Sequence, residues 1–147
     1  MDASPPLPLA HALQTSVWAY PILEVAHIGS IAVLFGSLVL VELRVLGFGS
    51  VLSAVSLARF GLPVTLAGFA GAAASGSLMF VAHAPEFLAN RAFLLKMVLL
   101  LTAGANAALF HTRGSLVRAD RFARVQAGVS LALWLSILAC GRLIAYV

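Results

Sequence analysis

Apolar residues run through this 147-residue chain in four long stretches, separated by short polar segments. About 20 consecutive apolar residues cross the hydrocarbon core of a bilayer as a helix, so each stretch is long enough to span it. Helices are expected because backbone polar groups in lipid must find partners within the same segment. Short connections then predict an all-α membrane protein, an up-down-up-down bundle of four transmembrane helices in one domain over residues 1–147. The predicted spans are Val17–Leu46, Phe60–Ala84, Phe93–Thr112 and Val125–Val147.

The segment before the first span, Leu7–Tyr20, combines prolines with Trp18 and Tyr20. Aromatic residues at the end of an apolar stretch are typical of the membrane–water interface, so we expect a short interfacial segment. Met1–Pro8 is proline-rich and has no basic region. We therefore expect no cleavable signal peptide.

Composition agrees with the membrane prediction, because 62% of the residues are hydrophobic and only 10% are charged. Soluble domains average about 25% charged residues. Basic residues cluster between the first and second and between the third and fourth spans, which predicts that these connections are cytoplasmic. We therefore expect a multi-pass protein of a bacterial inner membrane with both termini in the periplasm. The basic residues lack interleaved aromatics, so no nucleic-acid partner is expected.

Small residues mark the predicted packing faces of the spans. Such residues let helix backbones approach closely, or leave space for a flat cofactor. They are Gly29 and Gly36 in the first span, Gly68, Gly71 and Gly76 in the second and Gly104 in the third. We favour ordinary packing for most of them, and Gly76 could leave room for a porphyrin.

Glu24 and His27 lie one turn apart inside the first span. Ionisable side chains in a membrane are costly and mark either a function or a buried pairing. At 1.5 Å per residue, His27 lies about 25 Å from the cytoplasmic boundary and Glu24 about 30 Å. Lys96 falls near 25 Å and Arg142 near 27 Å, while Met79 and His83 fall near 30 and 36 Å. This outer polar layer is either the membrane interface or a site in the bundle, with Glu24 paired to Lys96 or Arg142.

Three functions are compatible with that layer. The first is one b-type haem for electron transfer, ligated by His27 and His83, with Lys96, Arg142 and Glu24 around it. The second is a cofactor-free accessory or anchor subunit that binds a quinone, a lipid, a partner membrane or periplasmic protein, or a second copy of the chain. The third is copper handling, in which Met79 and Met97 join the two histidines as soft ligands.

No hydrolase motif and no phosphate-binding loop is present. We therefore expect a non-catalytic or electron-transfer subunit rather than a stand-alone enzyme.

Three phrases of the chain resemble a family of small bacterial four-span membrane proteins of unknown function. They are the residues from Tyr20 to Gly47, from Asn90 to His111 and from Gly141 to Val147. That family is loosely similar to the copper-resistance D and cytochrome b561-like membrane proteins. The resemblance implies a four-helix membrane fold, and His27 and His83 are the positions that could match the haem-ligating histidines of cytochrome b561-like proteins.

Overall fold

A computed structural model describes residues 8–146, so the predictions for residues 1–7 and for Val147 lie outside the described part. It contains helices and no strands over those residues. Four of the helices are long and apolar enough to cross a membrane, which confirms the all-α four-helix class. The helices are α1 (Pro8–Thr15), α2 (Ala19–Leu46), α3 (Ala54–Ala82), α4 (Ala84–Ala89), α5 (Arg91–Thr112), α6 (Ser115–Arg118) and α7 (Arg121–Leu143).

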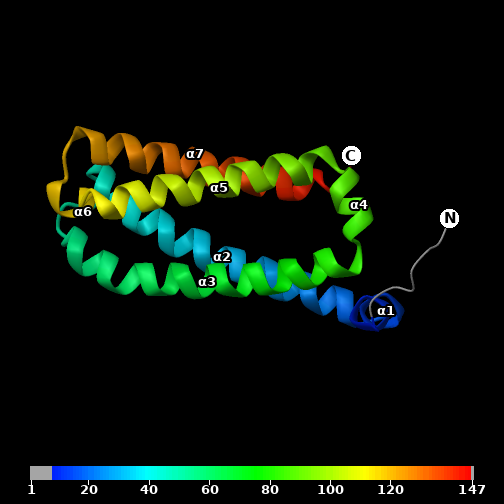
Figure 1. The fold of residues 1–147 in the computed structure, drawn as a ribbon. Coiled ribbons are helices and arrows are strands. Elements are labelled where there is room, and N and C mark those ends of the chain that lie inside the picture. The colour runs from blue at the N-terminus through cyan, green and yellow to red at the C-terminus, as the bar shows by residue number, and fades with distance from the viewer. Residues whose placement is uncertain (1–7, 147) are drawn as a thin grey trace.

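The four long helices lie side by side as two pairs, α2 with α3 and α5 with α7 (Figure 1). Helix α2 also packs against α7 and joins the pairs, whereas α3 and α5 make little direct contact over the described residues. Short helix α1 lies across the bundle axis at the end that also carries α4 and the end of α7. We name this end the α4 end, and the opposite end the α6 end.

Side-chain capping sets where the helices begin. Ser53 accepts a hydrogen bond from the backbone N–H of Ser56 at 3.3 Å, so α3 begins at Ala54 and not at the predicted Phe60. Asp120 accepts from Ala123 N–H at 2.8 Å, so α7 likewise begins before the predicted Val125. Such caps satisfy N–H groups that have no partner inside the helix.

The α3 helix ends at Ala82, because Pro85 disfavours continuation of a regular helix into α4.

Glycines of α3 allow the close approach of α2. A Cβ at Gly68 would lie 2.5 Å from the backbone N of Leu34, and one at Gly71 would lie 2.5 Å from Ser30 Oγ. Gly29, Gly36 and Gly104 have no such neighbour within 4 Å. The packing interpretation therefore holds for α3, and it is wrong for the three glycines of α2 and α5, whose faces turn away from the described helices.

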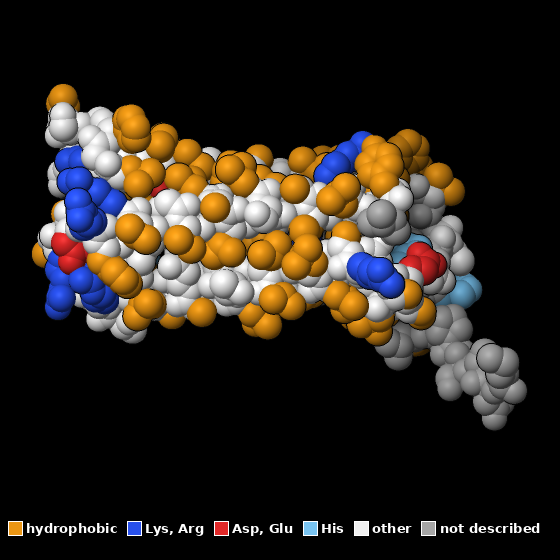
Figure 2. Space-filling view, turned by 90° about the horizontal axis from the view of Figure 1, so that it is seen from above, with side chains coloured by type: hydrophobic (Ala, Val, Ile, Leu, Met, Phe, Trp, Pro, Cys, Tyr) orange, Lys and Arg blue, Asp and Glu red, His pale blue; other side chains and the backbone are white. Residues whose placement is uncertain are grey.

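Charged side chains are distributed as a membrane protein requires. In Figure 2, most of the visible Lys and Arg gather at the α6 end, a few lie toward the α4 end, and the middle of the visible face carries apolar side chains. Many large apolar residues are exposed along the helices, among them Leu66 at 67% and Leu101 at 77%. Exposed leucines along all four long helices fit contact with lipid chains.

Candidate functional site

A cavity of about 1050 Å³ lies at the α4 end of the bundle. Six helices border it, namely α1, α2, α3, α4, α5 and α7. Pockets for small molecules and cofactors commonly measure about 300–1,000 Å³, with an apolar lining and a few convergent polar groups. This cavity has that character, and its polar side chains include Glu24, His27, His83 and Lys96. The depths predicted from the sequence put these four residues in one outer layer, and in the structure all four border this cavity.

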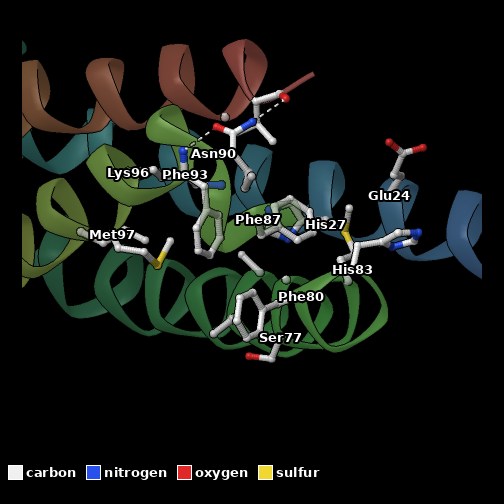
Figure 3. Close-up of a pocket in the computed structure, with 18 of the residues that line it drawn as sticks. Glu24, His27, Ser77, Phe80, His83, Phe87, Asn90, Phe93, Lys96 and Met97 are labelled. Carbon is white, nitrogen blue, oxygen red and sulfur yellow. Dashed lines mark hydrogen bonds between the residues drawn. The ribbon is translucent and has the colours of Figure 1, made fainter. Parts of the chain in front are cut away.

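Three phenylalanines form an aromatic wall at the centre of the cavity (Figure 3). The rings of Phe80 and Phe93 are stacked at 5.6 Å with an interplanar angle of 9°. Phe87 lies 5.1 Å from Phe93 and 6.3 Å from Phe80. The wall joins α3, α4 and α5 where α3 and α5 themselves stand apart. It offers flat apolar faces against which a planar ligand can pack.

His27 is held in a defined orientation by α3. Its Nδ1 lies 3.0 Å from Ser75 Oγ. The Ser75 hydroxyl donates its own hydrogen to the carbonyl of Gly71 at 2.7 Å, so its oxygen accepts from Nδ1–H. This pattern assigns the proton of a neutral imidazole to Nδ1 and leaves the lone pair on Nε2. Histidines that bind metals usually have their second ring nitrogen anchored in this way.

Gly76 provides the space in which that imidazole lies. A Cβ at this position would come within 3.0 Å of His27 Cε1. The expectation that Gly76 leaves room for a porphyrin face is therefore wrong, because the His27 ring occupies that side. Any flat ligand would lie beyond the imidazole, toward the aromatic wall.

His83 follows the last residue of α3 and lies at the edge of the cavity. Its ring meets Tyr20 edge to face at 5.1 Å, and its Nδ1 is buried without a hydrogen-bond partner. Seven residues separate Gly76 from His83, an axial rise of about 10 Å. Figure 3 shows the His83 side chain away from the aromatic wall. The two histidines thus border one cavity at different levels.

Lys96 reaches into the cavity from α5 toward α7. A Cβ at Gly141 would lie 3.5 Å from the Lys96 ammonium nitrogen, so the absence of a side chain at Gly141 makes room for that group. Within residues 8–146 no carboxylate pairs with Lys96, because the ion pair found there joins Arg113 and Asp120.

Glu24 and Arg142 do not form the buried pairing that their depths along the helices predicted. Glu24 is exposed at the cavity edge, and it forms no ion pair with Lys96 or Arg142 in the described structure. Arg142 is also exposed and does not line the cavity. Its guanidinium lies 4.8 Å from the Tyr146 ring centre and donates a hydrogen bond to the Tyr146 hydroxyl. The predicted pairing of Glu24 is therefore absent from this structure.

Both thioethers of the copper alternative, Met79 and Met97, also border the cavity. They lie on α3 and α5, on either side of the space that separates these helices. Within the described part of the chain there is no group of three or more His, Cys, Asp or Glu side chains arranged to hold a metal ion.

The sequence did not predict the aromatic wall or the hydrogen bonds of Asn90 beside it. Asn90 accepts from Phe93 N–H at 3.1 Å and donates to the carbonyl of Ile144 at 3.1 Å, which ties the start of α5 to the end of α7. A detectable signal was Asn90 directly before an apolar stretch, since Asn is a preferred helix N-cap. The meeting of the three phenylalanines depends on the break between α3 and α4, which periodicity alone does not place.

Comparison of the chain with family models, with curated proteins and with solved structures gives no significant match. The resemblance to small four-span bacterial proteins therefore stays a prediction from the sequence.

Proposed function

We propose that this chain is a redox-associated membrane subunit that binds one b-type haem in the cavity at the α4 end. The observation that supports it best is the imidazole of His27, whose Nδ1–H is anchored by Ser75 and whose Nε2 keeps its lone pair. That lone pair is the one an axial ligand needs. The cavity has the volume and the apolar lining of a cofactor pocket.

The residues of the cavity have distinct roles in this proposal. His27 would hold the haem iron, and Ser75 would fix the orientation of the imidazole. Lys96 neutralises an acidic substituent of the ligand, since an ammonium with no carboxylate partner in an apolar cavity attracts an anion. Phe80, Phe87 and Phe93 exclude water from the ring. Bound haem supplies one-electron chemistry.

His83 is the second candidate iron ligand. Its Nδ1 has no partner in the structure, and its ring borders the same cavity. His83 lies about 10 Å along α3 from Gly76, beside which the His27 ring lies, so the two histidines would approach a shared ligand from different levels. The number of histidine ligands is therefore an experimental outcome that spectra of single variants decide.

The proposed location follows from the basic residues at the α6 end. Arginine-rich connections face the cytoplasm, so the α4 end and its cavity would lie on the periplasmic side of a bacterial inner membrane. An electron donor or acceptor would then approach from the periplasm or within the membrane, as a partner subunit or a quinone.

An absorption spectrum of the full chain, purified after expression with ample haem, tests the proposal. We expect a reduced-minus-oxidised Soret and α-band that disappears in His27→Ala. His111→Ala is the matched control, because His111 is exposed near the C-terminal end of α5, outside the cavity. A colourless protein that also fails to bind added haem would refute the proposal. Metal analysis of the same sample tests copper.

A second candidate is a cofactor-free accessory or anchor subunit that binds a quinone or lipid. The observation that favours it is the largely apolar lining of the cavity with a few polar side chains, which suits a ligand with an apolar body and a polar head group. His27 and Lys96 would then hydrogen-bond the ligand head group. A colourless preparation in which a ubiquinone analogue protects the chain against thermal unfolding would support this function over haem.

A further inference from the structure

Glu42 is a buried carboxyl group in the half of the bundle opposite the cavity. Its side chain belongs to α2 and is 7% exposed. Four residues separate it from Leu46, the last residue of α2, so it lies about 6 Å from the α6 end of that helix. Fifteen residues separate it from His27, about 22 Å along the helix. It is therefore independent of the proposed haem site.

The residues that face Glu42 come from α7. Ser130 of α7 is the polar side chain that acts on the carboxyl group. Val45, one turn after Glu42, packs with Ala123 and Ala127. In this antiparallel register Glu42, three residues before Val45, falls between the levels of Gln126 and Ser130. Gln126 is only 3% exposed.

Gln126 is fixed by two further elements. Its side-chain oxygen accepts from the Ser115 hydroxyl of α6 at 2.8 Å, and its backbone carbonyl accepts from Asn106 Nδ2 of α5 at 3.1 Å. Since its Oε1 is engaged by Ser115, its Nε2 is directed elsewhere in the buried interior. The polar group thus joins α2, α5, α6 and α7 at one level.

Two buried polar atoms in this group have no hydrogen-bond partner, Glu42 Oε2 and Gln126 Nε2. They are complementary, because an amide N–H donates and a carbonyl oxygen accepts. Leaving either of them unpaired in an apolar interior destabilises the fold. A small rearrangement that pairs them, directly or through a water molecule, removes both costs.

No cation compensates a negative charge on Glu42 in the described structure. Arg44 on the same helix donates to the carbonyl of Leu52, and Arg59 and Arg124 are exposed. The ion pair of the described residues is Arg113 with Asp120, on the surface of the α6 end. A buried carboxylate without a cation is far more costly than the neutral acid.

We propose that Glu42 and Gln126 form a proton-binding site, in which Glu42 takes up one proton from the aqueous side of the α6 end. The neutral acid donates its O–H to Ser130, and its carbonyl oxygen accepts from Gln126 Nε2. Release transfers the proton to water and leaves the carboxylate, with no other bond changed. The ligand of this site is a proton, and the α6 end is the side from which it exchanges.

Infrared spectroscopy of the full chain in lipid vesicles at pH 7 tests this site. We expect the carbonyl band of a protonated carboxyl group, shifted in D₂O and absent from Glu42→Gln. Glu24→Gln is the matched control, an exposed carboxyl on the same helix, and should keep the band. Gln126→Leu should shift the band to higher frequency, because the carbonyl oxygen loses its donor.

Several outcomes would overturn the proposal. They are a wild-type spectrum without a protonated carboxyl band, a band that survives in Glu42→Gln, and a band that disappears in Glu24→Gln. If Glu42→Gln does not fold, the wild type still decides, because raising the pH should abolish the band reversibly. The haem proposal is tested by a different signal, the visible absorption spectrum.

Discussion

The Nδ1 of His27 on α2 lies 3.0 Å from the hydroxyl oxygen of Ser75 on α3. The hydroxyl donates to the carbonyl of Gly71 in its own helix, which leaves its oxygen free to accept from Nδ1–H of a neutral imidazole. This pair links helix packing to ligand chemistry, since the contact that joins α2 to α3 also selects the ring nitrogen that faces a ligand.

Ser75→Ala tests that link. The variant removes the acceptor of His27 Nδ1–H and adds no bulk, so the imidazole can rotate and change tautomer. We expect haem affinity to fall about 10- to 100-fold, as is usual when the anchoring partner of a metal-binding histidine is lost. Titration with haem and the position of the Soret band measure the effect. Ser136→Ala is the control, because Ser136 is exposed and bonds its own helix. Equal affinities for the two variants would contradict the assigned role.

Lys96→Met tests whether the ligand carries an acidic group. If Lys96 neutralises a propionate, the wild type should bind haem at least about tenfold more tightly than haem dimethyl ester, the size of one charge-assisted hydrogen bond. In Lys96→Met the two ligands should bind equally. Arg91→Met removes a nearby exposed cation that does not border this cavity, and should keep the preference. A preference that survives in Lys96→Met would show that another group holds the acid.

The hydrophobic pattern was sufficient for the four-helix class, because the length and polarity of a membrane span are properties of the local sequence. Counting depth also brought His27 and Lys96 to one level. The depth of a residue along a helix does not, however, predict which way its side chain points around the helix axis. Gly141 faces Lys96, while Arg142, the next residue and about 100° further round, is exposed. The inward or outward direction of Arg142 depends on how α7 packs, which the sequence did not supply.

Gly68→Ala tests the contact between α2 and α3. The added Cβ would lie 2.5 Å from Leu34 N and 2.9 Å from Ser30 O, both backbone atoms that cannot rotate away. We expect the helices to separate and the free energy of unfolding to fall by about 1–3 kcal/mol. Thermal unfolding in detergent measures it. Gly104→Ala, where nothing lies within 4 Å, should be neutral or stabilise by up to about 1 kcal/mol. Similar melting temperatures for both variants would refute the close packing.

The ionisation of Asp120, at the surface of the α6 end, should make the stability of the fold depend on pH. Asp120 accepts from Arg113 at 2.7 Å and caps α7 through Ala123 N–H at 2.8 Å. The hydrogen bond from Arg113 and then the cap hold the pKa of this carboxyl group below its usual value of 3.8. Because the pKa of Asp120 is lower in the folded chain than in the unfolded chain, its carboxylate stabilises the fold at pH values above the unfolded pKa. This stabilisation is lost as the pH falls through the folded pKa.

Asp120→Asn keeps a capping oxygen and removes the charge, so it isolates the ionic part of this interaction. We expect the variant to unfold at a lower temperature than the wild type at pH 7, with the difference shrinking as the pH falls below about 4. High salt at pH 7 should reduce the same difference, because the pair is exposed to solvent. Glu86→Gln is the control, an exposed carboxyl on α4 that forms no ion pair in the described structure. A wild-type advantage that persists unchanged at pH 3 would show that the ionised carboxylate of Asp120 contributes nothing to stability.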